Sequence, residues 1–120
     1  MMQGGRPSRF TDKKSTRYFS DKQEKQVAKA VGGKVVPNSG APRFLGGDVN
    51  TDMCLIECKT CTKEQKSFAI KKEWLEKNRE EAFAMGKQYS ALAFDFGSGT
   101  NYYVVTERMF KEWLEGLDKH

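Results

Sequence analysis

Short runs in which apolar and polar residues alternate predict a series of β-strands. The clearest pair lies in the middle of the chain, where GGDV and MCLIECK are separated by a turn around residues 50–52. The tetrapeptide GSGT predicts a second turn, between two later strands. The strands are expected at residues 34–37, 46–49, 53–59, 91–96 and 101–106.

Three other stretches have the helical period. The first starts at Ser20, where Gln23 three positions later suggests a capping box, and it ends before Gly32. The second is expected over residues 71–85, and the third follows Thr106 as its N-cap. The apolar stripe of the third helix consists of Met109, Phe110, Trp113, Leu114 and Leu117.

The order of these elements, one helix, three strands, a helix, two strands and a last helix, predicts an α/β fold of the mixed α+β kind. A central mixed sheet is then flanked by packed helices. With 120 residues, of which 38% are hydrophobic, the chain is expected to form one domain with a modest core.

Positive charge is concentrated in the N-terminal third of the chain. Residues 1–40 hold nine Lys and Arg and three acidic residues, a balance of +6, whereas the remainder holds twelve and thirteen, a balance of −1. We therefore expect a flexible basic arm over residues 1–19, followed by a folded domain over residues 20–120. Such arms contact nucleic-acid phosphates, although a passive solubilising tail fits the charge equally well. The candidate contacts are Arg6, Arg9, Lys13, Lys14 and Arg17.

Cysteine usage and hydropathy indicate the compartment. Cys54, Cys58 and Cys61 are odd in number and crowded together, which favours buried, reduced thiols over a disulfide framework or a zinc site. No apolar run has the length of a membrane span, and the N-terminus lacks the apolar core of a signal peptide. We expect a cytoplasmic protein that does not associate with membranes.

The strand MCLIECK carries charge that a buried strand normally avoids. Alternation puts Glu57 and Lys59 on one face, and pairing with GGDV brings Asp48 near Glu57. Two carboxylates can hold Mg²⁺, and an adjacent lysine can orient a water or neutralise charge on a phosphate. The alternative is a structural ion pair between Glu57 and Lys59.

Glu24 on the first helix favours a metal site over a purely structural ion pair. It shares a helical stripe with Val27, Ala28 and Val31, the stripe expected to pack on the sheet. A carboxylate there is costly unless a lysine or a metal-bound water interacts with it.

Glu24, the Asp of GGD and the ECK triplet, in a chain of this length and element order, resemble the PD-(D/E)XK nuclease superfamily. The chain is most similar to the small archaeal-type Holliday junction resolvases and their phage relatives. The resemblance covers roughly residues 20–110 and implies a restriction-endonuclease-like core. It also implies a Mg²⁺-dependent endonuclease, in which Mn²⁺ can substitute, that cuts branched DNA such as four-way junctions as a homodimer.

Individual roles follow from the same resemblance. Asp48 and Glu57 match the metal ligands, Lys59 the catalytic lysine and Glu24 the helical carboxylate, while Ser39 matches a loop serine that contacts DNA. The spacing between Asp48 and Glu57 is short for the superfamily and requires a tight hairpin. If the protein is viral, its compartment is the host cytoplasm.

Further DNA contacts and other functions remain open at the level of sequence. Lys63 and Lys66 follow the ECK strand and are candidates for phosphate contacts. Trp74 and Trp113 lie on apolar helical stripes, which favours core or dimer contacts. Alternative functions are a catalytically inert nucleic-acid-binding module of the same fold and a nuclease acting on flaps, nicks or linear duplex.

Overall fold

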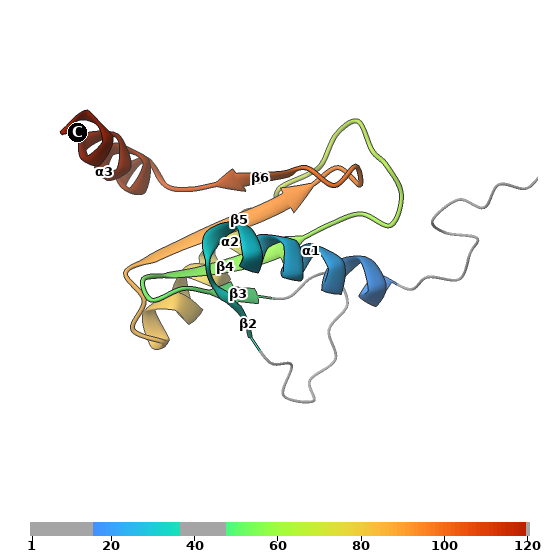
Figure 1. The fold of residues 1–120 in the computed structure, drawn as a ribbon, viewed down its shortest axis with the longest axis horizontal. Helices are drawn as coiled ribbons and strands as arrows, with labels where there is room; N and C mark the ends of the chain where they lie inside the picture. Colours follow the sequence, from blue (N-terminus) through green and yellow to red (C-terminus); the bar gives the residue numbers. More distant parts are fainter. Residues whose placement is uncertain (1–15, 37–47, 120) are drawn as a thin grey trace, which may run out of the picture.

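A computed structural model describes residues 16–36 and 48–119 of the protein (Figure 1). Within these ranges, three helices accompany one five-stranded sheet. The mixed α/β fold expected from the sequence is therefore confirmed. The elements are α1 (Thr16–Val31), β2 (Lys34–Val35), β3 (Asp48–Asn50), β4 (Cys54–Lys59), α2 (Lys72–Ala84), β5 (Tyr89–Asp95), β6 (Asn101–Val104) and α3 (Glu107–Asp118).

The strands follow one another across the sheet in the order β2-β3-β4-β5-β6. All neighbours are antiparallel except β4 and β5, which are parallel. Two parallel neighbours need a long connection from one end of the sheet to the other, and α2 lies within it. The sheet is therefore mixed because α2 connects β4 to β5 and lets these two strands run parallel.

Helix α1 covers one face of the sheet and α2 the other (Figure 1). On the α2 face, the side-chain amide of Asn78 donates to the backbone carbonyls of Leu55 and Ala91, at 3.2 and 3.0 Å. It therefore joins the helix to β4 and β5. On the α1 face, the apolar cluster consists of Val27, Val49, Cys54, Ile56, Cys58, Ala91 and Ala93.

The start of α1 differs from the sequence prediction. The helix begins at Thr16, so Ser20 lies inside it and is buried, and the capping box proposed for Ser20 and Gln23 is wrong. Gln23 instead reaches the sheet, where its amide donates to the backbone carbonyl of Lys59 at 2.8 Å. Residues 16–19 of the expected arm are therefore helical, and Phe19 is buried.

The other helix boundaries follow the sequence signals more closely. Gly32 ends α1 with a φ of 71°, a conformation that glycine adopts without strain. The Thr106 side chain caps α3 by accepting from the backbone N–H of Met109. However, α3 does not lie over a face of the sheet as expected: it extends beyond β6, and none of its side chains is fully buried, although Met109 at its start packs partly buried against the core cluster (Figure 1).

The cysteines lie on or next to β4. Cys54 and Cys58 are buried and Cys61 is partly exposed, and none of the three forms a disulfide. Burial raises the pKa of the Cys54 thiol, an effect that nearby Lys87 partly offsets. Across the described ranges, no helix combines the length and apolar character needed to cross a membrane.

Candidate functional site

Asp48 and Glu57 face each other across the hairpin of β3 and β4. Their Cα atoms are partners in the antiparallel register, next to the pair Val49 and Ile56. Directly opposite residues in such a pair have Cβ atoms about 4.5 to 5.5 Å apart and project to the same face. The tight hairpin required by the sequence is therefore present, and it brings the two carboxylates together on the α2 face.

Lys59 completes this cluster at the end of β4. Its Nζ lies 3.0 Å from Oε2 of Glu57, and the two side chains are only 13% and 17% exposed. The same ammonium lies 4.5 Å from the ring centroid of Trp74 on α2. We call Asp48, Glu57 and Lys59 the carboxylate–lysine site; its lysine contacts both the Glu57 carboxylate and the Trp74 ring.

Sequence reasoning missed this role of Trp74. The tryptophan lies on a helical apolar stripe, which points to packing, and only the parallel crossover from β4 through α2 brings it over Lys59. Its ring also packs near Phe68, at 6.3 Å between centroids, and Phe68 packs on Phe94 of β5. The tryptophan is thus fixed in place by an aromatic cluster beside the site.

Buried polar contacts fix the end of β4 that carries Lys59. Thr60 donates through its hydroxyl to the buried carboxylate of Asp95 at 2.7 Å, and the backbone N–H of Gly97 donates to the same oxygen at 2.8 Å. The Gln23 amide holds the Lys59 carbonyl. Because these hydrogen bonds are buried or partly buried, they hold the backbone at Lys59 firmly in place.

Lys87 fixes the opposite end of the hairpin. Its ammonium donates to the side-chain oxygen of Asn50 at 3.3 Å and to the backbone carbonyl of Thr51. Thr51 in turn accepts from the backbone N–H of Cys54 at 3.0 Å through its hydroxyl. Lys87 therefore stabilises the turn that sets the register of Asp48 and Glu57.

Glu24 is carried by α1, which packs on the face of the sheet opposite to Asp48 and Glu57. Glu24 is 2% exposed and lies on the stripe of α1 that includes Val27, which packs against Val49 and Ile56. Residues adjacent to those two along the strands project to the opposite face, where Asp48 and Glu57 lie. The helix expected to complete the site thus packs on the other face of the sheet.

The candidate DNA contacts are only partly within the described residues. Arg17 is exposed on α1, and Lys63 and Lys66 are exposed on the connection between β4 and α2. Lys71 lies 5.8 Å from the Trp74 ring, so an exposed lysine shares that ring with Lys59. The candidates that fall outside residues 16–36 and 48–119 are Arg6, Arg9, Lys13, Lys14 and Ser39.

The chain was also compared with known proteins. It matches no protein-family model, and no curated protein or solved structure is significantly similar to it. Function is therefore inferred from the geometry of the carboxylate–lysine site.

The donor set of this site fits magnesium. Mg²⁺ is bound through oxygen, usually by one or two carboxylates together with substrate phosphates and waters. Asp48 and Glu57 supply two carboxylates on adjacent strand positions. Within the described ranges, no group of three or more His, Cys, Asp or Glu side chains is placed to hold a metal.

Proposed function

We propose that the protein is a Mg²⁺-dependent endonuclease that hydrolyses DNA phosphodiester bonds. The observation that carries this proposal is the position of Asp48 opposite Glu57, with the ammonium of Lys59 3.0 Å from the Glu57 carboxylate. Two carboxylates can hold Mg²⁺ and a nearby lysine can stabilise charge on a phosphate, so this group of side chains can support metal-assisted phosphodiester hydrolysis.

Each residue has a distinct part in that chemistry. Asp48 and Glu57 would hold Mg²⁺, or Mn²⁺ in its place, which neutralises negative charge on the scissile phosphate. Water adds to phosphorus and releases a proton to solvent, while the P–O bond to the leaving oxygen breaks and that oxygen takes up a proton. Negative charge builds on the phosphate oxygens during this step. Lys59 is 13% exposed, so its positive charge is weakly screened and stabilises that charge more than a surface lysine does.

The surroundings of the site favour a polyanionic substrate. The net charge of the chain is +5, with the excess in residues 1–40. Lys63, Lys66 and Lys71 are exposed on the segment between the catalytic strand and α2. These lysines can contact phosphates on either side of the scissile bond, and their contacts depend on salt because counterions are released on binding.

A catalytically inert nucleic-acid-binding module is the second candidate. The short ion pair between Glu57 and Lys59, supported by Trp74, satisfies both charges without a metal. A purely structural role for these residues would produce the same geometry. The two candidates differ in whether Asp48 and Glu57 bind metal.

The preferred substrate within the proposal is branched DNA, in particular the four-way junction, and the working unit is a homodimer. One copy of the chain has one carboxylate–lysine site and can address one scissile phosphate at a time. Two symmetric cuts in a junction require two such sites in fixed relative orientation, which a two-fold dimer provides. Flaps, nicks and linear duplex are the competing substrates.

The test is cleavage of a synthetic four-way junction beside a linear duplex of matched sequence, each with Mg²⁺ or with chelator. We expect paired cuts near the junction with Mg²⁺, slower cutting of the duplex, and no cutting of either with chelator. Binding of both DNAs without any cutting would instead support the inert module.

A further inference from the structure

Helix α3 presents an apolar face that nothing in the described part of the chain covers. Trp113 and Leu117 are 63% and 66% exposed, and Phe110 and Leu114 are also exposed. All four lie on one stripe of the helix. Such a contiguous apolar surface on a helix that projects from the sheet is typical of an interaction site.

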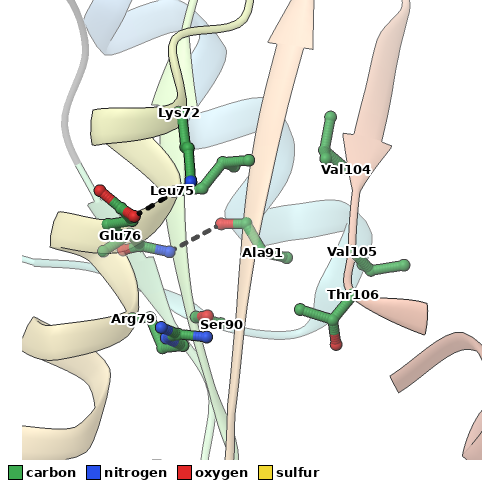
Figure 2. A pocket seen from close by; sticks show the side chains of 10 residues that line it. Lys72, Leu75, Glu76, Arg79, Ser90, Ala91, Val104, Val105 and Thr106 are labelled. Atoms are coloured by element: carbon green, nitrogen blue, oxygen red, sulfur yellow. Dashed lines mark hydrogen bonds and ion pairs between the residues drawn. The ribbon is translucent and has the colours of Figure 1, made fainter. Parts of the chain in front are cut away.

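A groove lies beside this helix, between α2 and β6 (Figure 2). It has a volume of about 270 Å³, and Figure 2 shows Leu75 and Arg79 of α2 on one side and Val104 and Val105 on the other. A second hollow continues from it past Ala82 and Phe83 to Met109 at the start of α3. We call the two hollows together the α2–β6 groove; none of the residues of the carboxylate–lysine site lines it.

The attachment of α3 prevents it from covering its own groove. The Tyr89 hydroxyl donates to the Glu112 carboxylate, which also forms an ion pair with Arg108 at 3.2 Å. The Arg108 guanidinium lies 5.3 Å from the centre of the Tyr89 ring, and Met109 packs against the core cluster. These contacts hold α3 at the Tyr89 end of β5, and moving the helix over its own groove would break them.

The charges of the two surfaces are complementary. Outside α3, the residues lining the α2–β6 groove include three basic side chains and one acidic one, Glu76, which is paired with Lys72. Helix α3 has four acidic and two basic residues, a balance of −2. The three basic residues are Lys72, Arg79 and Lys87; Arg108, which also lines the groove, belongs to α3 and is paired with Glu112.

We infer that the α2–β6 groove of one copy receives the apolar face of α3 from a second copy, in a reciprocal two-fold exchange. An exposed apolar helix and an open groove of opposite charge occur in the same chain and meet at Thr106 and Arg108. A two-fold axis near that junction lets each helix enter the other copy's groove. Two equivalent contacts then form at once, which is the arrangement that closes a homodimer. The inference names the partner of the proposed nuclease but rests on surfaces separate from its site.

The first test measures mass in solution by light scattering coupled to gel filtration. Wild type is expected to be a dimer at micromolar concentration. Trp113→Glu on the helix and Leu75→Glu in the groove should each raise the dimer dissociation constant by more than about a hundredfold, as loss of a central interface residue does. Arg79→Glu, an exposed substitution that preserves folding, provides a second groove variant. Tyr103→Glu is the matched control, because Tyr103 is an exposed aromatic on β6 that lines neither hollow.

The second test distinguishes reciprocal exchange from a contact between two α3 helices. A mixture of Trp113→Glu, whose groove is intact, with Arg79→Glu, whose helix is intact, can form one of the two contacts. We expect the mixture to associate more tightly than either variant alone. Circular dichroism of each variant confirms that loss of association is not loss of folding.

Three results would overturn the inference. These are a monomeric wild type, a dimer that survives Trp113→Glu, and a dimer that is broken by Trp113→Glu but unaffected by both groove variants. A wild-type protein that is dimeric but does not cleave DNA would contradict the proposed function without contradicting the reciprocal exchange of α3.

Discussion

Asp48 and Glu57 are direct partners in the register of β3 and β4, and this relationship defines the candidate site. Two carboxylates placed opposite each other on neighbouring strands repel unless a cation lies near them. Lys59 provides one positive charge at 3.0 Å from Glu57. We propose that a divalent metal binds between the two carboxylates, and the other predictions follow from this binding.

Magnesium is expected to stabilise the protein through these two carboxylates. A ligand that binds only the folded state raises the free energy of unfolding by about 2.7 kcal/mol at a hundred times its dissociation constant. Wild type should therefore melt at a higher temperature in Mg²⁺ or Mn²⁺ than in chelator. Asp48→Asn and Glu57→Gln should lose this increase. Thermal unfolding monitored by circular dichroism provides the measurement, and an equal increase in all three proteins would place the metal elsewhere.

Lys59→Ala should lower the cleavage rate by about a hundredfold or more, because one oriented charge near the phosphate is removed. Lys77→Ala is the matched control, because Lys77 is exposed on α2 and lines neither hollow of the α2–β6 groove. The measurement is the single-turnover cleavage rate of each variant. Similar rates for both would show that Lys59 contributes no more to cleavage than an exposed lysine.

Trp74 is expected to act as a positioning residue for Lys59. A cation over an aromatic ring is stabilised by about 0.5 to 2 kcal/mol, so Trp74→Leu should lower kcat by about twofold to thirtyfold with little change in KM. Trp74→Phe keeps an aromatic face and should retain most of the activity. If Trp74→Phe and Trp74→Leu are equally impaired, the ring serves packing and not the lysine.

Glu24→Gln should leave cleavage within a few-fold of wild type, since α1 packs on the face of the sheet opposite to Asp48 and Glu57. The substitution preserves volume and removes the charge of a buried group, so its effect should appear in the free energy of unfolding measured with urea. If Glu24→Gln lost as much cleavage as Glu57→Gln with unchanged stability, Glu24 would belong to the catalytic site.

The features that could be predicted are those set by residues close together in the sequence. Alternation in MCLIECK and the turn before it were sufficient to place Asp48 beside Glu57, and Thr106 marked the start of α3. Local patterns of this kind fix faces, caps and tight turns. The hairpin is therefore the part of the site that the sequence specifies most directly.

Contacts between distant residues were not predictable in the same way. The Trp74 ring meets Lys59 only because the crossover helix packs on the sheet, and the Gln23 amide reaches the Lys59 carbonyl across α1 and β4. Helical periodicity gave Gln23 a local capping role and gave Glu24 a place near the site. To place Gln23 and Glu24 one must know which face of the sheet α1 covers. The spacing of apolar residues along one helix does not give that information.

The central claim is that Asp48 and Glu57 bind the metal that cleaves DNA. Single-turnover cleavage of a four-way junction by wild type, Asp48→Asn and Glu57→Gln, purified identically and supplied with Mg²⁺, tests it most directly. We predict that wild type cuts the junction and that each variant is slower by at least about a hundredfold while binding the junction with similar affinity. Cleavage by either variant at the wild-type rate would contradict the account.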